Sequence, residues 1–255
     1  MDKKLRYKLT INPHYESWRD FMLNIENFFH SSHESIHKAR NELKVILYQN
    51  TDVVIKAFRV PNIINQLIYG NFRNSKAQKS YDNALMLLEL GICTPKPIGY
   101  IEFYHYFLFK KSFFVTEKYH YDFTIREPLL NKNFADRENI FKAFAAFTLM
   151  LHNKGVYHKD YSPGNILIKK LEEGYEFCLV DINRMEFAPL DLNTKLFNFT
   201  KLWIDDEDLA FVMHEYCLLG GLDFKSLGMQ AINLSNKYKA SKEMRRKLKR
   251  KVLRK

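Results

Sequence analysis

The sequence predicts an α+β protein with two lobes, a β-rich first lobe followed by a reduced helical second lobe. Two features of the 255-residue chain support this prediction. Before about residue 118, apolar runs rich in β-branched residues alternate with turn residues, which is typical of paired strands. After that point, apolar residues recur at helical spacing. We therefore expect a first lobe over residues 1–118, a second lobe over residues 119–235 and a basic tail over residues 236–255.

The first lobe is predicted to be built from strands and one helix. Residues 42–49 and 51–58 are rich in Val, Ile and Leu and are separated by Asn50, which predicts a hairpin. Residues 75–91 contain a cluster of Ala and Leu and end in Gly91, which predicts a helix with its stop signal. Extended structure is then expected over residues 94–103 and 111–119.

The second lobe is predicted to begin with a buried helix. Ile140, Phe144, Phe147 and Leu151 fall at positions i, i+4, i+7 and i+11, on one face of a helix that ends near Gly155. A hairpin and two helical segments are expected to follow: ILIKK (166–170) paired with YEFCLVD (175–181), and helices near residues 192–219 and 224–252.

The composition excludes several classes of protein. No apolar run approaches the roughly 20 residues that cross a bilayer, and the first 13 residues lack the apolar stretch of a secretory signal. Cys93, Cys178 and Cys217 are too few and too scattered for a disulfide framework. We therefore expect a compact protein of the reducing cytoplasm.

The net charge of +11 is concentrated at the C-terminus. Residues 236–255 contain eleven Lys and Arg residues and one acid, Glu243, so this segment carries +10 and the rest of the chain +1. Met244, Leu248 and Val252 recur every four residues among these charges and predict a narrow apolar stripe on a basic helix.

Such a helix is expected to bind an anionic membrane surface, which would hold the protein peripherally at the inner face of the cytoplasmic membrane. The stripe could instead pack on the second lobe and leave only the charges outward. The rest of the chain shows no interleaved basic and aromatic motif, so we expect no nucleic acid partner.

The residues able to support chemistry cluster after the predicted central helix. His158 to Asn165 read H-K-D-Y-S-P-G-N, and an apolar run ends at Asp181, sixteen residues beyond Asn165. Phosphoryl transfer from ATP requires a carboxylate beside the acceptor hydroxyl, together with oxygen ligands that place Mg²⁺ against the phosphates. Asp160 is the candidate for the first role, and Asn165 and Asp181 are the candidates for the second. Lys56, on a predicted strand upstream, is expected to neutralise the α- and β-phosphates, while His158 is expected to brace the loop.

The segments HKDYSPGNIL (158–167) and LVDINRM (179–185) resemble the Kdo/heptose lipopolysaccharide kinase family, whose fold is protein-kinase-like. The resemblance covers about residues 40–190. It implies that Asp160 is the catalytic base and that Asp181 binds the metal, with Asp-Ile-Asn in place of the Asp-Phe-Gly of protein kinases.

The resemblance also implies positions for the nucleotide. The phosphate-binding loop is expected at residues 30–41, which contain no glycine. Asp82 is the nearest acid on the predicted helix to pair with Lys56. The backbone of Glu117 and Tyr119 is expected to bind adenine.

A small or lipid-linked acceptor is favoured over a protein. The 74 residues after Asp181 include the basic tail, contain no A-P-E signature and are too few for a protein-substrate platform. Kdo is an acidic sugar linked to lipid A, and Lys159, Arg184 and the tail offer complementary positive charge. We therefore expect an ATP-dependent carbohydrate kinase acting on a Kdo or heptose residue of a lipopolysaccharide precursor.

Three alternatives remain open from the sequence. A kinase for an aminoglycoside-like or choline-like alcohol would share every catalytic residue. A pseudokinase binding module would follow if the glycine-free phosphate loop did not support turnover. A nucleic-acid-binding protein would use the basic tail alone.

Overall fold

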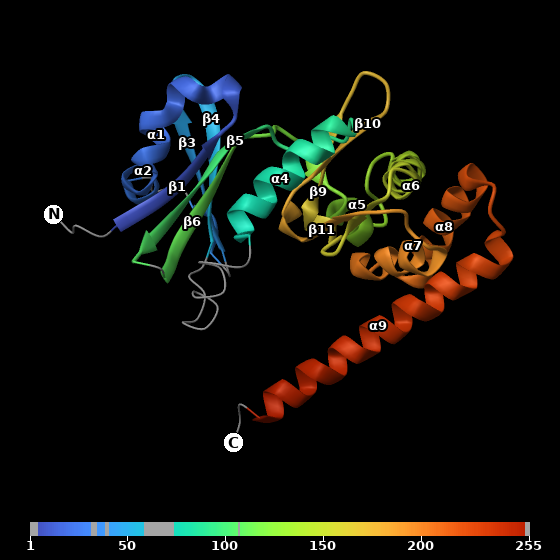
Figure 1. The fold of residues 1–255 in the computed structure, drawn as a ribbon. Helices are drawn as coiled ribbons and strands as arrows, with labels where there is room; N and C mark the ends of the chain where they lie inside the picture. The colour runs from blue at the N-terminus through green and yellow to red at the C-terminus, as the bar shows by residue number, and fades with distance from the viewer. Residues whose placement is uncertain (1–4, 32–34, 39–40, 59–73, 107, 253–255) are drawn as a thin grey trace. The chain divides into compact units, whose positions relative to one another are not determined.

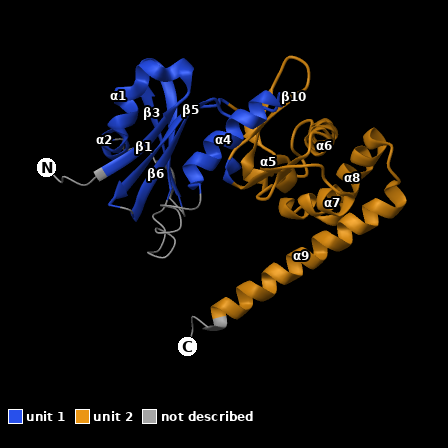
Figure 2. Cartoon of the chain, viewed as in Figure 1, with its two compact units in different colours: residues 1–120, 181–183 blue, residues 121–180, 184–255 orange. Residues whose placement is uncertain are grey.

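The computed structural model describes residues 5–31, 35–38, 41–58, 74–106 and 108–252, which form two compact units (Figure 1). The first unit contains residues 1–120 and 181–183, and the second contains residues 121–180 and 184–255 (Figure 2). The first unit thus runs to His120 rather than to the expected residue 118. It also includes the short segment 181–183.

One antiparallel sheet organises the first unit, with its six strands in the order β1-β5-β6-β4-β3-β2. The expected hairpin is confirmed: β3 and β4 pair from Asn41 with Phe58 to Tyr48 with Thr51. Gln49 and Asn50 close it with φ of 46° and 61°, the left-handed backbone of a two-residue hairpin turn. The strands are β1 (Leu5–Ile11), β2 (Ser35–Lys38), β3 (Asn41–Tyr48), β4 (Thr51–Phe58), β5 (Pro97–His105) and β6 (Leu108–Glu117).

Helices cover both faces of this sheet (Figure 1). The helices α1 (Arg19–Leu23) and α2 (Ile25–Ser31) lie on one face, where their apolar side chains pack against Val53 and Ile55 of β4. The helix α4 (Lys76–Glu89) packs on β5 and β6 from the other face. Because side chains alternate along a strand, Lys56 points to the face opposite Val53 and Ile55, which is the face covered by α4.

The predicted helix over residues 75–91 is confirmed as α4. Ser75 caps its start, with Oγ accepting a hydrogen bond from the backbone N–H of Gln78 at 3.0 Å. Gly91 follows its end with φ of 69°, a conformation that glycine adopts without steric cost.

No element is predicted from the sequence for residues 5–31, where the structure has β1, a 3₁₀ segment (Pro13–Trp18), α1 and α2. The two α-helices are short, with five and seven residues, and β1 pairs with β5, which is remote in sequence. Local periodicity is weak in such short elements, so the tertiary contacts that stabilise them leave little local signal.

The second unit is mainly helical and is centred on the predicted helix α6 (Arg137–Asn153). All four residues of its predicted apolar face are buried: Ile140, Phe144, Phe147 and Leu151. Gly155 has φ of 69° just beyond the helix. The other helices are α5 (Arg126–Leu130), α7 (Leu192–Phe199), α8 (Asp206–Gly220) and α9 (Phe224–Val252).

Short strands of the second unit carry the loop that the motif predicts. The expected hairpin is confirmed as β9 (Ile166–Lys170) with β10 (Tyr175–Leu179), and β7 (Phe123–Thr124) pairs with β9. A second pair joins β8 (Val156–His158) to β11 (Met185–Phe187). Residues Asp160 to Asn165 therefore lie between β8 and β9.

The described part of the basic segment, residues 236–252, is the C-terminal part of one long helix rather than a separate tail. The helix α9 is continuous over 29 residues, and its first part packs on α8 and α7. Met244 and Leu248 are 63% and 56% exposed, so these two residues of the predicted stripe do not pack on the second unit. None of the helices in the described ranges is long and apolar enough to cross a membrane.

Candidate active site

The loop after β8 folds back on itself. The amide Nδ2 of Asn165 donates to the backbone oxygen of Asp160 at 2.9 Å, and the backbone N–H of Asn165 donates to the oxygen of Ser162 at 2.9 Å. Because its nitrogen is used in this way, Asn165 keeps its amide oxygen as an acceptor that forms no hydrogen bond with the described residues. The half-buried carboxylate of Asp160 accepts no hydrogen bond from any residue that the structure describes, so it is available to a substrate hydroxyl.

His158 braces this loop, as predicted. Its Nδ1 accepts the backbone N–H of Asp160 at 3.1 Å, and its Nε2 lies 3.1 Å from the backbone oxygen of Val180. An acceptor at Nδ1 and a carbonyl oxygen at Nε2 require the neutral ring with its proton on Nε2. One buried imidazole therefore links the Asp160 backbone to the residue that precedes Asp181.

A chain of buried side chains holds His158 in turn. Asn198 of α7 donates from Nδ2 to the backbone oxygen of His158 at 3.0 Å, which turns its Oδ1 toward Nε2 of His152 at 3.2 Å. His152 of α6 then accepts the Tyr216 hydroxyl at Nδ1, at 2.9 Å. Burial lowers the pKa of His152 to about 4, so the ring is neutral near pH 7 and the chain has one consistent set of donors and acceptors.

The same face of α6 holds the loop at a second point. Thr148 lies one turn before His152 and donates from Oγ1 to the backbone oxygen of Phe144 at 2.9 Å, so its oxygen accepts the hydroxyl of Tyr161, also at 2.9 Å. Tyr161 is fully buried and stacks on Phe144. Burial raises the pKa of Tyr161, which stays protonated and remains a donor.

The first unit places Lys56 against Asp181. The Lys56 ammonium lies 2.5 Å from Oδ1 of Asp181, and the Asn183 amide donates to the same oxygen at 2.6 Å. The Lys56 side chain is 12% exposed and that of Asp181 is 32% exposed, so the ammonium is largely shielded from solvent while the carboxylate is partly accessible. Asp181 adopts φ of 55°, a left-handed backbone that is uncommon for residues other than glycine but that Asp and Asn adopt more readily than most.

Asp82 is not the partner of Lys56, contrary to the prediction. Its side chain lies on the exposed side of α4 and accepts a hydrogen bond from Gln78. The next residue, Asn83, donates from Nδ2 to the backbone oxygen of Ile182 at 2.7 Å. Successive residues on a helix point about 100° apart, so the side chain that meets the Asp181 segment belongs to Asn83, an amide that a search for an acid overlooks.

The expected adenine-binding residues lie at the end of β6. Glu117 is the last residue of that strand, where its N–H donates to the backbone oxygen of Lys96 at 2.9 Å. Its carboxylate accepts the Tyr15 hydroxyl at 2.6 Å, so the carbonyl is the group that it can offer to a base. Tyr119 lies in the irregular segment beyond the strand.

The expected phosphate-binding loop lies partly outside the described residues, which leave out 32–34 and 39–40. Residues 35–38 form β2, which pairs with β3.

The donor atoms present suit the group that the sequence predicts. The carboxylate of Asp181 and the amide oxygen of Asn165 are hard oxygen donors of the kind that Mg²⁺ prefers. In the described ranges no group of three or more His, Cys, Asp and Glu could hold a metal alone. Mg²⁺ in kinase sites typically uses one or two protein oxygens together with substrate phosphates, so these residues fit an ion that arrives with a nucleotide.

The positive charges expected beside the loop differ in their partners. Lys159 forms an ion pair with Glu186, which offsets its charge. Arg184 is exposed and has no ion pair with a described residue.

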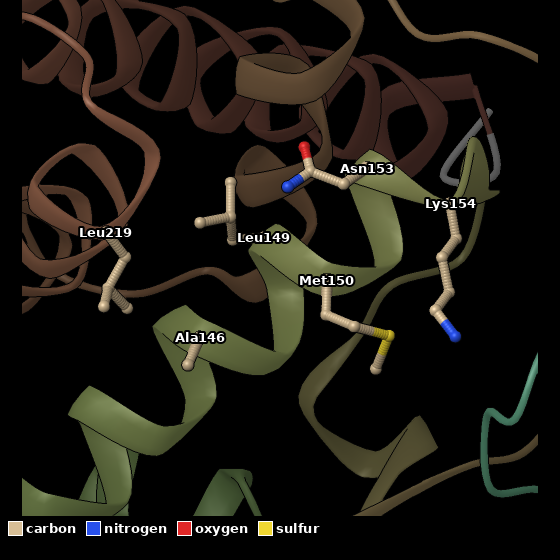
Figure 3. A pocket seen from close by; sticks show the side chains of 6 residues that line it. All are labelled: Ala146, Leu149, Met150, Asn153, Lys154 and Leu219. Carbon is tan, nitrogen blue, oxygen red and sulfur yellow. The ribbon is translucent and has the colours of Figure 1, made fainter.

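An open hollow elsewhere on the second unit contains none of the predicted residues. It is lined mainly by one side of α6 and by Leu219 near the end of α8 (Figure 3). Its lining residues are Ala146, Leu149, Met150, Asn153, Lys154 and Leu219.

Comparisons with known proteins agree with the resemblance found in the sequence. A family model described as the lipopolysaccharide kinase (Kdo/WaaP) family matches residues 49–196. A solved structure described as WaaP in complex with acyl carrier protein aligns over 93% of this chain and 98% of its own, with a TM-score of 0.60 and 14% identity. That likeness confirms the predicted two-lobed, protein-kinase-like α+β fold. No curated protein sequence matches the chain.

Replacing Asn198 by Ala is expected to loosen the loop, because it removes the donor to His158 and leaves an N–H of His152 unpaired. Hydrogen exchange followed by mass spectrometry should show the amides of residues 156–165 exchanging about 10-fold faster relative to those of α6. Leu196→Ala removes a fully buried side chain from the same helix and should lower Tm without changing that ratio. An equal change of the ratio in both variants would contradict a specific role for Asn198.

Proposed function

We propose that this chain, which belongs to the lipopolysaccharide kinase (Kdo/WaaP) family, transfers the γ-phosphoryl group of ATP to a hydroxyl of a lipid-linked Kdo or heptose residue. The observation that carries the proposal is the family match over residues 49–196, which includes Lys56, Asp160, Asn165 and Asp181. Each of these four residues has the side chain that phosphoryl transfer needs.

The roles follow from the chemistry of each group. Asp160 orients the acceptor hydroxyl and takes its proton as the new oxygen–phosphorus bond forms and the bond to the β-phosphate oxygen breaks. Lys56 neutralises phosphate charge, and its ion pair with Asp181 supports that assignment by placing an ammonium and a metal-type carboxylate together. Mg²⁺, held by Asn165 and Asp181, would supply further neutralisation of the phosphates. Asp82, Glu117 and Tyr119 were predicted to contact the nucleotide; of these, only backbone recognition by Glu117 and Tyr119 remains part of the proposal.

Asp160→Asn is expected to lower the turnover number by at least about 100-fold, because the amide cannot accept the proton. Nucleotide binding and Tm should be nearly unchanged. Asp181→Ala should instead abolish Mg²⁺-dependent nucleotide binding, measured by calorimetry with and without chelator. Glu173→Gln, an exposed acid in the β9–β10 turn, serves as the charge-matched control. Near-wild-type transfer by Asp160→Asn would refute its role.

The acceptor is tested by offering radiolabelled ATP with Kdo-lipid A, heptosylated precursor, neutral sugars, aminoglycosides, choline and proteins. The product on the lipid-linked sugar is expected to be an acid-stable phosphate ester, since the site transfers to an alcohol. Transfer to amino alcohols or to proteins, with none to the lipid-linked sugars, would refute the proposed acceptor class. Absence of transfer to every acceptor would favour a binding module.

The outward part of α9 is proposed to bind the anionic membrane surface that presents the acceptor. Met244 and Leu248 are exposed on α9, where basic side chains surround them. On the inner side of the helix, Tyr238 and Arg246 contact Trp203, with Arg246 5.4 Å from the indole ring. The helix is thus attached through aromatic contacts on one side while its apolar stripe and most of its charges stay outward. Each Lys or Arg near an anionic surface contributes about 1 kcal/mol at most, and salt reduces the sum.

Deleting residues 241–255 is expected to reduce phosphorylation of acceptor in anionic vesicles far more than that of a soluble, delipidated acceptor. High salt should reproduce the deletion in the intact protein, because screening weakens the same attraction. Met244→Gln with Leu248→Gln should weaken vesicle binding, whereas Leu219→Gln, an equally exposed leucine of α8, should not. If the deletion reduced phosphorylation of the vesicle-bound and the soluble acceptor equally, membrane recruitment would be contradicted. Binding to purified acyl carrier protein and not to vesicles would also contradict it, and would assign the helix a protein partner like that of the WaaP structure.

A further inference from the structure

Arg126 is placed beside the Asp160–Asn165 loop by the backbone rather than by a flexible side chain. The β7 strand pairs with β9, with Phe123 opposite Ile168 and Thr124 opposite Leu167. The ladder continues one step, because the N–H of Ile125 donates to the oxygen of Ile166 at 3.0 Å. Ile125 is followed by Arg126, the first residue of α5, and Ile166 is preceded by Gly164 and Asn165.

The guanidinium of Arg126 lies directly over Gly164. A Cβ at position 164 would lie 2.5 Å from Nη2 of Arg126, 3.2 Å from its Cζ and 3.8 Å from its Nε. Gly164 does not have a left-handed φ, so no special backbone conformation requires glycine there. What the missing side chain provides is room for the guanidinium against the loop that carries Asp160.

The positive charge of Arg126 is not compensated within the described part of the protein. Arg126 is exposed and forms no ion pair with a described residue. Its neighbour Glu127 uses its carboxylate to accept the backbone N–H and the hydroxyl of Thr124, at 2.9 and 2.6 Å. By contrast, Lys159, which precedes Asp160 in the sequence, is paired with Glu186.

We propose that Arg126, seated on Gly164, binds the carboxylate of a Kdo acceptor and thereby selects Kdo over heptose and other neutral sugars. This proposal rests on the proposed function. A guanidinium offers two parallel N–H groups that match the two oxygens of a carboxylate, whereas a lysine offers only a point charge. A cation fixed beside the loop binds the acceptor's anionic group while one of the acceptor's hydroxyls meets Asp160.

The proposal is tested by measuring kcat/KM with a carboxylate-bearing acceptor and with the same acceptor after its carboxyl is reduced to an alcohol. The ratio of the two values is the specificity for the acidic group. Arg126→Gln is expected to lower this ratio about 10- to 100-fold, the scale of a lost hydrogen bond to a charged group. The ratio for Arg126→Lys should lie between those of the wild-type protein and Arg126→Gln, because lysine keeps the charge but loses the two parallel N–H groups.

Two further variants separate this role from a general effect of charge or fold. Gly164→Ala adds a Cβ that displaces the guanidinium and should lower the ratio, though less than Arg126→Gln does, because an exposed arginine can shift. Lys169→Gln removes an exposed charge from β9 and should leave the ratio at its wild-type value.

Several outcomes would overturn the proposal. An equal fall of kcat/KM for both acceptors in Arg126→Gln would do so, as would a raised KM for ATP with an unchanged ratio, which would assign Arg126 to the nucleotide. If the effect of Arg126→Gln on kcat/KM disappeared only when phosphates were removed from the acceptor, Arg126 would be assigned to those phosphates instead. If the wild-type protein transferred phosphate to neither acceptor, the proposed function itself would fail, whereas an unchanged ratio in an active protein would refute Arg126 alone.

Discussion

The structure of the second unit depends on one buried imidazole, that of His158. It accepts the backbone N–H of Asp160 on one side and meets the backbone oxygen of Val180 on the other. Two stretches of chain that the site needs, the loop at Asp160 and the strand end before Asp181, are thereby tied to the same small ring. A buried donor or acceptor without a partner costs about 1–3 kcal/mol, so neither contact can be lost without a penalty.

The surrounding helices can be understood as the support of that ring. Asn198 binds the backbone of His158, His152 binds Asn198, and Tyr216 closes the chain. The polar residues Thr148 and His152 lie one turn apart on the buried face of α6, which otherwise consists of apolar core. Each of them is satisfied by a hydrogen bond, as buried polar groups require. The polar groups on this face of α6 bind the loop, and the apolar groups pack in the core. The loop is therefore oriented by its attachment to a helix that the core holds in place.

The first unit holds two opposite charges together, with the lysine largely buried and the carboxylate partly exposed. Lys56 is carried on a central strand and Asp181 on a segment with a left-handed backbone. Asn83 fixes that segment through the oxygen of Ile182. An ion pair at 12% and 32% side-chain exposure is more costly to break than a surface pair, because one charge would remain desolvated.

Much of this could be predicted from the sequence, and the reasons for the exceptions are physical. The hairpin of β3 and β4, the helices α4 and α6 and the loop motif have strong local signals in periodicity and turn residues. The prediction of Asp82 rests on its being the nearest acid, whereas the side chain that meets the Asp181 segment is the neighbouring amide, Asn83. Arg126 and Asn198 carry no local signal at all: their places depend on pairing with β9 and on packing against α6, which join residues about 40 positions apart.

The most direct test of this account is the protonation of His158, read by nuclear magnetic resonance from the nitrogen shifts of histidine labelled with ¹⁵N. The hydrogen bonds require a neutral ring at pH 7, with an unprotonated Nδ1 and a protonated Nε2. Observation of that tautomer, assigned by comparison with His158→Gln, is the predicted result. A ring protonated on Nδ1 at pH 7 would contradict the account, because the N–H of Asp160 would then lack its acceptor and the loop would lack its brace.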